Sequence, residues 1–393
     1  MMMEAVLKFD IHPEYGEVTI SLPIPDEDYD RTIELLEELG AGDVLAQDCR
    51  VVKLESEYPV LERLKGAAVN VDELDYLAKR LESFWKSEKD QFQAMAHKLD
   101  LTEIQDFINL TFCCQDTTVI TDFSNLEEVG REHCIKNDGL TVDEYYSIDG
   151  RAEALKLIRS GNGTVTPYGV VYDNGMELKQ LYNGRNFPSY NWKVPTLELE
   201  TAPGGEAEGH FDLPMPDRRL QREIERAGLD QQDIPLKVEL SGLRGAAVAL
   251  NLDGLTVGDL PGLNRLCRAV EPMTEEDREK LEAVVKFTEA SGIDALCQLA
   301  ENLDLFDFVP NVYTAEEYGR YLIQKSGKYT YDEKLWDFYD YQSFGEDRAW
   351  QEGGHFTECG YVAYHGTLLL EELMREDPAE LYQREQGMGM EML

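Results

Sequence analysis

The chain has 393 residues, of which 78 are Asp or Glu and 37 are Lys or Arg, so its formal net charge is -41. This balance excludes nucleic acid and anionic membranes as partners, because both are bound through clustered Lys and Arg. Apolar residues make up 42% and aromatic residues 10%, so the chain is expected to fold, in two or more domains.

The first predicted element is a β-hairpin followed by a helix. The strands AVLKFDI and EVTISLPI flank a turn at residues 12–16, and a helix begins at Asp26 and ends at Gly40. A Leu-rich helical region, about 70–110, comes next. A mixed region then has a helix over 127–136 and short strands in GTVTPYGVVYDNG. The stretch 176–195 is rich in Asn, Pro and aromatic residues and predicts an ordered connector.

The second half of the chain repeats these elements. LPIPD at residues 22–26 recurs as LPMPD at 213–217, and the helices that follow keep apolar residues at matching positions: Tyr29, Ile33 and Leu36 in the first, Leu220, Ile224 and Ala227 in the second. A second helical region is predicted at about 256–303 and a helix at 315–325. GHFTECGYVAYHG then matches the first strand region at five of thirteen positions, and a short helix is predicted from Thr367 to Pro378, before a frayed end.

These patterns predict an α+β fold made of two tandem copies of an elongated three-part unit. The parts of each copy are a β-hairpin with a helix, a helical middle and a mixed α/β end. We expect copy 1 at residues 1–190, with parts 1–65, 66–115 and 116–190, and copy 2 at 191–393, with parts 191–250, 251–305 and 306–393.

The sequence contains no pattern that favours catalysis or cofactor binding. Six scattered His and seven Cys without C-x-x-C spacing predict no metal site, and the cysteines are typical of buried thiols in a reducing compartment. Nucleophile-elbow and phosphate-loop motifs are missing. A pair of carboxylates acting as a glycosidase site stays open, but so many acids place some side by side by composition alone. We therefore expect no enzyme and no cofactor.

The sequence also bears on where the protein acts. No apolar run is long enough to cross a membrane, and MMMEAVLKFD does not read as a signal peptide. We expect a soluble, cytoplasmic protein.

The charge itself is the remaining functional signal. A folded monomer of this size exposes about 16,000 Å², so the net charge averages one per about 380 Å², against one per about 110 Å² on duplex DNA. Imitation of DNA therefore requires acids gathered on one part of the surface. Residues 101–150 carry eleven acids and two bases, and copies 1 and 2 carry net charges of -19 (18 bases, 37 acids) and -22 (19 bases, 41 acids).

Copy 2 resembles the ArdA antirestriction family over about residues 200–366. The matching segments are FDLPMP, LTVGDLPGLNRLCRAVEPMTEEDREKLEAVV, YTAEEYGRYLIQKSG, FYDYQSFGEDR and GHFTECGYVAYHG. Copy 1 resembles the same unit more faintly, through ISLPIP, EEVGREHC and GTVTPYGVVYDNG. Both copies lack the Asn-Leu-Gly-Lys-Tyr opening common in the family, and in copy 2 Arg218, Arg219, Arg222 and Arg226 take the place of an acidic helix face.

The resemblance implies a non-catalytic DNA mimic that occupies the DNA-binding groove of the modification subunits of Type I restriction-modification enzymes and protects mobile DNA. It implies dimer formation, so this chain is expected to be a monomeric pseudo-dimer or a homodimer. The alternative is an acidic module that inhibits another basic DNA-binding protein, such as a nuclease, a CRISPR effector or a nucleoid protein.

We expect the phosphate-mimicking groups among eighteen acids: Asp26, Glu27, Asp28, Asp30, Glu34, Glu37, Asp116, Asp122, Glu127, Glu128, Asp304, Asp307, Glu316, Glu317, Asp337, Asp340, Glu346 and Asp347. The most specific stretch, DFYDYQSFGEDRAW at 337–350, is open to three interpretations: an active site, a half-buried strand and turn, or a contact surface. In that stretch Phe338, Tyr341, Phe344 and Trp350 are expected to pack inside. Gly319 is expected to allow close packing, and Arg320 to pair with an acid. The Arg-rich helix is not expected to present phosphate-like charge.

Overall fold

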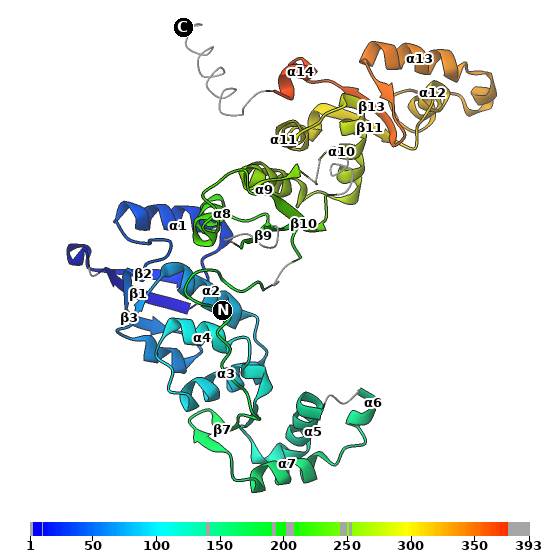
Figure 1. Cartoon of the computed structure of the whole chain (residues 1–393). Helices are drawn as coiled ribbons and strands as arrows, with labels where there is room; N and C mark the ends of the chain where they lie inside the picture. Colours follow the sequence, from blue (N-terminus) through cyan, green and yellow to red (C-terminus); the bar gives the residue numbers. More distant parts are fainter. Residues whose placement is uncertain are drawn as a thin grey trace. The chain divides into compact units, whose positions relative to one another are not determined.

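The structure, a computed structural model, describes residues 3–9, 11–138, 142–190, 194–201, 208–243, 250 and 254–375. Helices and small antiparallel sheets alternate along the chain, which confirms the predicted α+β class (Figure 1). The chain divides into two compact units: unit 1 holds residues 1–192 and 221–227, and unit 2 holds 193–220 and 228–393. The two predicted copies stay a prediction, although both units contain the same three kinds of part.

Unit 1 begins with a four-stranded antiparallel sheet of order β2-β1-β3-β4. Side chains alternate along β1, so that Ala5, Leu7 and Phe9 are buried in the core. Helix α1 buries one face on this core through Tyr29 and Ile33, as its spacing predicts. The elements are β1 (Met3–Phe9), β2 (Glu17–Leu22), α1 (Asp26–Glu38), β3 (Cys49–Glu55) and β4 (Ala68–Val69).

The helical middle of unit 1 extends the same core. It consists of α2 (Val71–Glu82), α3 (Lys86–Lys98) and α4 (Ile104–Leu110). Asn70 starts α2 with a reciprocal capping box, in which Glu73 accepts a hydrogen bond from the Asn70 backbone N–H. Residues 176–190 pack back onto this region, since Tyr182 is fully buried and its hydroxyl donates to Glu73 at 3.0 Å. The predicted ordered connector is confirmed for these residues, while 191–193 lie outside the described part.

Unit 1 ends in a three-stranded antiparallel sheet with two long helices that lie side by side (Figure 1). The strands are β5 (Thr118–Ile120), β6 (Thr164–Thr166) and β7 (Gly169–Tyr172), in the order β5-β7-β6, and the helices are α5 (Leu126–Asp138), α6 (Val142–Tyr145) and α7 (Gly150–Arg159). Helices α5 and α7 touch through Gly130 and Gly150: a Cβ on Gly130 would lie 1.7 Å from the carbonyl oxygen of Gly150. No side chain fits there, so both positions require glycine.

Unit 1 also includes residues 221–227, the last part of α8 (Asp217–Ala227). Arg222 and Arg226 are only 4% and 3% exposed, and both bind the buried carboxylate of Asp72. Arg222 Nε donates to Asp72 Oδ2 at 3.0 Å, and Arg226 Nη2 donates to the same oxygen at 3.0 Å. Tyr29 donates to Asp72 Oδ1 at 2.8 Å. Burial raises the pKa of Asp72, but the two guanidinium groups outweigh burial and lower it.

Unit 2 repeats the three kinds of part. Its first sheet has the order β10-β8-β9, from β8 (Leu197–Thr201), β9 (His210–Leu213) and β10 (Leu236–Ser241). The helical middle, as predicted, consists of α9 (Leu260–Val270), α10 (Glu275–Thr288) and α11 (Ile293–Glu301). The last sheet has the order β11-β13-β12, from β11 (Phe306–Pro310), β12 (His355–Phe356) and β13 (Gly360–Tyr364), with helices α12 (Ala315–Gln324), α13 (Tyr341–Glu352) and α14 (Leu370–Leu373). The predicted helix up to Pro378 continues beyond the described residues, as does the frayed end.

Helices α12 and α13 touch through a glycine pair, as α5 and α7 do. A Cβ on Gly319 would lie 2.1 Å from the carbonyl oxygen of Tyr341, and one on Gly345 would lie 1.8 Å from that of Ala315. Arg320 pairs with Glu316 at 2.7 Å. Both predictions for the Tyr-Gly-Arg segment are therefore confirmed.

Short 3-10 helices link the main elements: η1 (Pro13–Tyr15), η2 (Pro59–Leu64), η3 (Cys114–Asp116), η4 (Phe123–Asn125), η7 (Val257–Asp259), η8 (Leu303–Leu305) and η9 (Glu333–Phe338). All seven cysteines are free thiols, and six of them are buried, as expected. Among the described residues, no helix combines the length and the apolar character needed to cross a membrane.

Candidate acidic interaction surface

The predicted phosphate-mimicking acids lie at the surface. Of the eighteen, only Asp30 and Glu127 are half-buried, and the other sixteen are exposed. They occupy five places: helix α1, the stretch from η3 to the start of α5, the segment before β11 with β11, the first turn of α12, and η9 with α13. The acids are thus carried mainly by helices and their starts, where the backbone fixes the position of each side chain.

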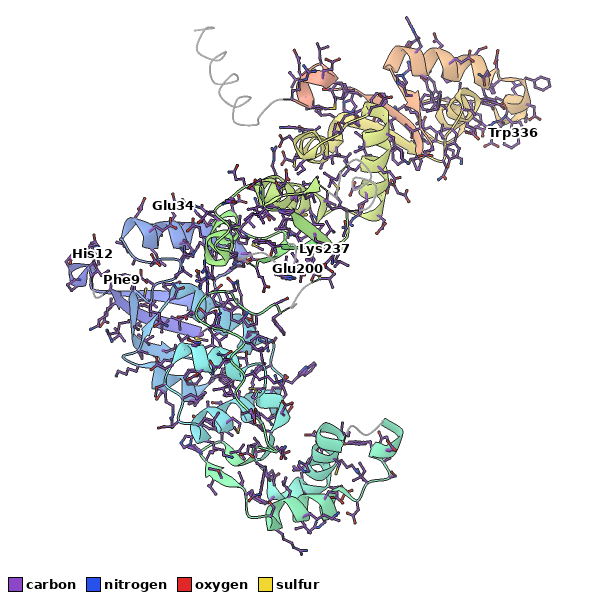
Figure 2. All side chains as sticks on the ribbon, viewed as in Figure 1. Phe9, His12, Glu34, Glu200, Lys237 and Trp336 are labelled. Carbon is purple, nitrogen blue, oxygen red and sulfur yellow. The ribbon has the colours of Figure 1, made fainter. Side chains whose placement is uncertain are left out.

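The acids of α1 form the first group. Asp26, Glu27 and Asp28 occupy its first turn, where negative charge also favours the helix dipole. The side chains of Glu27, Asp28 and Glu34 make no hydrogen bond or ion pair with the described residues, and Figure 2 shows Glu34 projecting from α1. Asp26 lies 4.0 Å from Lys79, and Glu37 lies 3.7 Å from Arg222.

The acids before and within α5 are partly engaged in local structure. Asp122 accepts hydrogen bonds from the backbone N–H and hydroxyl of Ser124, both at 2.7 Å, and these bonds lower its pKa. Glu127 pairs with Arg131 at 2.7 Å, and Glu128 accepts from Asn125. Only Asp116 in this group makes no side-chain bond within the described chain. Here the charge remains, but Asp122, Glu127 and Glu128 also have structural roles.

In unit 2, Asp304 and Asp307 are exposed beside and on β11, and Glu316 and Glu317 start α12. Glu317 closes a capping box with Thr314, and Glu316 pairs with Arg320. The structure therefore leaves Asp304 and Asp307 as the more freely exposed acids of this region.

The stretch 337–350 forms η9 and then α13, so it is a helical surface and not a strand and turn. Asp340 starts α13 by accepting from the backbone N–H of Ser343 at 3.0 Å, which lowers the pKa of Asp340. Glu346 and Asp347 are exposed on the helix and accept from side-chain amides one turn away. Asp337 is exposed on η9. The helical structure contradicts the interpretation as a strand and turn, and the contact surface stays a prediction.

The aromatic residues of this stretch are only partly internal. Tyr341 is buried and Phe344 packs against the core of unit 2, as expected. Phe338 and Trp350 are 84% and 83% exposed, so the prediction that they pack inside is wrong. Trp350 shares the outer face of α13 with Glu346 and Asp347, because these residues are spaced by three and four. Trp336 on η9 is also half exposed (Figure 2).

Several acids that contribute to the net charge are buried and so add nothing to the charge of the surface. Asp72, Glu73 and Asp75 of α2 are 7%, 2% and 4% exposed. Asp75 accepts from the backbone N–H of Ile24 at 2.7 Å. The pattern Asn70-x-x-Glu73 before an apolar run is the sequence signal that could have identified Glu73 as a capping residue. Likewise, Arg222 and Arg226 face an internal acid, so these two arginines of the Arg-rich helix add no surface charge.

One group of acids in unit 2 surrounds a cation. His210 on β9 lies 3.1 Å from Asp212, 3.3 Å from Glu200 and 3.7 Å from Glu198. Its hydrogen bond to Asp212, with support from the two glutamates, raises the pKa of His210 to about 9 against the effect of burial. Glu198, His210 and Asp212 have donor types that suit a divalent cation. At neutral pH, however, the imidazole is protonated and donates hydrogen bonds, so it neutralises part of this cluster.

Part of the chain matches a known protein family. Residues 205–363 match the family described as Antirestriction protein (ArdA), which confirms the resemblance of that segment. The matched segment contains α12, η9 and α13 with their exposed acids. It supports an antirestriction function. A search of curated proteins finds no match to the chain.

Proposed function

We propose that the protein is a non-catalytic antirestriction protein that mimics DNA and occupies the DNA-binding groove of the modification subunits of Type I restriction-modification enzymes. The observation that carries the proposal is the family match over residues 205–363, in a segment whose helices present exposed acids. We also propose that the two units act as a covalent pseudo-dimer, either as a monomer or in a homodimer.

The charge supports this function by its physical consequence. A DNA-binding groove is lined with Lys and Arg that neutralise phosphates, and binding releases the counterions of the DNA. A chain with a net charge of -41 competes with DNA for the same Lys and Arg side chains of the groove. Like DNA, it carries counterions that binding would release. Association should therefore be fast and should weaken steeply as salt is added.

The fold supports the proposal by holding the acids in place. The glycine contacts between α12 and α13 leave no space for relative movement without loss of packing. Glu346 and Asp347 of α13 thus project from a preorganised pair of helices. Preorganised charges bind with a smaller entropic cost than charges on mobile loops.

The test is inhibition of purified Type I restriction-modification enzymes by the full chain at stoichiometric amounts. The sharp variant neutralises a set of acids at once: Asp304→Asn, Asp307→Asn, Asp337→Asn, Glu346→Gln and Asp347→Asn. The matched control keeps the charge at the same positions by exchanging Asp for Glu and Glu for Asp. We expect the neutral set to lose most inhibition and the charge-preserving set to retain it.

Two outcomes would contradict the proposal. Full inhibition by the neutral set would show that binding does not depend on these charges. If the wild-type chain inhibits no Type I enzyme, these enzymes are not its target. In the second case, capture of a nuclease, a CRISPR effector or a nucleoid protein by the full chain would favour the alternative function.

A further inference from the structure

Unit 1 has a polar hollow, here the α3–α5 hollow, between helices α3 and α5 beside strand β5 (Figure 1 shows α3 and α5). Its volume is about 380 Å³, within the range of small-molecule sites. Polar side chains line most of it, with Val119 and Val129 as the apolar part of the wall. None of the sequence motifs pointed to this place.

Gln91 supplies the inner wall of the hollow and is only 4% exposed. Its amide nitrogen donates to the carbonyl oxygens of Thr117, at 2.5 Å, and Gln115, at 3.4 Å. Since carbonyl oxygens only accept, these bonds fix which end of the amide is nitrogen. The amide oxygen Oε1 is buried and accepts no hydrogen bond from the described residues. A buried acceptor of this kind calls for a donor.

Asp90 is a second acceptor in the hollow. It is half-buried, and its carboxylate forms no hydrogen bond or ion pair within the described chain. Burial raises the pKa of Asp90, and Lys86, one helical turn earlier, opposes this effect. A carboxylate that has lost part of its hydration without gaining a partner is stabilised by an incoming cation.

The rest of the lining makes the hollow negative. Glu128 and Glu132 of α5 add two carboxylates to Asp90, and Lys86 is the one lysine or arginine of the lining. His133 contacts the Thr118 hydroxyl through Nδ1 at 2.9 Å. The hollow therefore combines three carboxylates with a buried amide acceptor, a set that favours a cation with several N–H donors.

We propose that the α3–α5 hollow is a binding pocket for a guanidinium group, and that its occupant is an arginine side chain from the DNA-binding groove of the partner enzyme. This inference rests on the proposed function for the identity of the partner. A guanidinium presents five N–H donors in a planar fork, which can bridge Asp90, the Gln91 amide oxygen and an α5 glutamate. The methylene stem can pack on the two valines.

The occupant fits what a DNA-binding groove offers. Arginines in such grooves contact phosphates and enter the minor groove, where the negative potential is strongest. A negative hollow on a DNA mimic reproduces that environment in a way that a flat acidic face does not. The hollow then contributes specificity for arginine over lysine, while the surface acids contribute attraction at longer range.

The first experiment measures binding of agmatine, which carries a guanidinium, to the full chain by calorimetry and by NMR of the Gln91 side-chain amide. Putrescine, which has an ammonium in place of the guanidinium of agmatine, tests ammonium chemistry, and N-carbamoylputrescine, which has a neutral urea in its place, is the shape control. We expect agmatine to bind, putrescine to bind more weakly and N-carbamoylputrescine to bind more weakly than either. Asp90→Asn and Glu132→Gln should each weaken agmatine binding by about tenfold, the effect of losing one charge-assisted hydrogen bond.

The matched control is Glu17→Gln on β2, which removes one exposed charge from unit 1 away from the hollow. It should change agmatine affinity by less than about twofold, since exposed charges interact weakly through water. Glu132 is exposed, so its variant should fold even if Asp90→Asn disturbs α3. Equal binding by wild type and both pocket variants, or unchanged Gln91 signals at saturating agmatine, would overturn the pocket.

The second experiment separates the pocket from the proposed function. In inhibition of a Type I enzyme, Glu132→Gln should reduce potency about tenfold relative to Glu17→Gln. Agmatine binding together with equal potency of the two variants would overturn arginine of the partner as the occupant. Agmatine binding without any inhibition by wild type would contradict the proposed function and with it this occupant.

Discussion

The α/β ends of the two units, residues 116–175 and 303–366, share a plan but differ inside. Each has a three-stranded antiparallel sheet whose middle strand is the last in sequence, β7 or β13. Each joins two helices through a pair of glycines that excludes any side chain. In both, a helix starts with two neighbouring glutamates, at 127–128 and 316–317.

The interiors are filled in different ways. The core of the first end consists of Ile120, Leu126, Ala154 and Tyr172, and the polar hollow lies beside it. In the second end Tyr318 and Tyr361 stack with their ring centroids 3.8 Å apart, and both hydroxyls donate to Glu352. In the alignment of the two ends, Tyr318 corresponds to Val129, which lines the hollow of the first end.

The comparison shows which features the two ends have in common. Helix contacts and acids at helix starts are kept, whereas the interior is aromatic in one end and partly open and polar in the other. The helix packing and the acids at the helix starts are thus common to the two ends, while the interiors differ. The α3–α5 hollow belongs to the first end.

The largest expected effect comes from emptying the aromatic core. Tyr361→Ala removes a fully buried ring and should cost about 3–5 kcal/mol of local stability. Val170 occupies the matching strand position of the first end and is half-buried. Val170→Ala should therefore cost about 1 kcal/mol of local stability or less. Hydrogen exchange of the amides in β13 and β7 measures both locally. Equal losses would show that the two interiors do not differ in energy.

The helix contacts should be equally sensitive in the two ends. Gly130→Ala and Gly319→Ala each force a Cβ against a carbonyl oxygen, at 1.7 Å and 2.1 Å, so the helices must separate. We expect each to cost about 1–3 kcal/mol, by overpacking. Ser343→Gly, on the outer face of α13, controls for a substitution that needs no space. Hydrogen-exchange protection factors of the amides in α5 and α12 measure the loss. Unchanged protection in either variant would show that the two ends do not share this close helix contact.

Acid should destabilise the second end through Glu352. Burial raises the pKa of Glu352, but hydrogen bonds from Tyr318, Tyr361 and Arg348 outweigh it and lower the pKa. A lowered pKa adds stability that is present above the unfolded value of about 4.5 and is lost as the pH falls through the folded value. Glu352→Gln should cost about 1.5 kcal/mol at pH 7 and remove this acid dependence. Fluorescence unfolding at pH 7 and pH 4 tests the sign, and an unchanged pH dependence in the variant would rule out Glu352 as its source.

Single surface acids should have the smallest effect. Asp347→Asn on α13 and Asp116→Asn before β5 each remove one of many charges at an exposed position. We expect unchanged stability and less than about a twofold loss of inhibition for each, because exposed charges are screened. Inhibition titrations at low salt would detect a larger role. A tenfold loss from either change would identify a specific contact instead of distributed charge.

Much of the fold follows from the sequence, because periodicity and helix-start residues are local signals. Helix α1 was predicted from Asp26 to Gly40 and runs from Asp26 to Glu38. Gly319 was predicted as a close contact, and Cβ geometry confirms it. The exposure of the candidate acids also agrees with expectation in sixteen of eighteen cases.

What the sequence could not provide depends on residues far apart in the chain. Asp72 meets Arg222 across 150 positions, so neither sequence segment reveals that the other neutralises it. Trp350 was expected inside because it is aromatic, but its place on α13 depends on which face Gly345 and Gly319 bring into contact. The α3–α5 hollow needs three separate segments and leaves no motif.

The most direct test of the central claim is whether the protein and duplex DNA exclude each other on a purified Type I modification enzyme. Affinity for the enzyme should be measured with and without saturating target DNA, over a series of salt concentrations. The proposed mimicry predicts mutually exclusive binding and a logarithm of affinity that falls linearly with the logarithm of salt concentration. A ternary complex with DNA, or an affinity independent of salt, would contradict it.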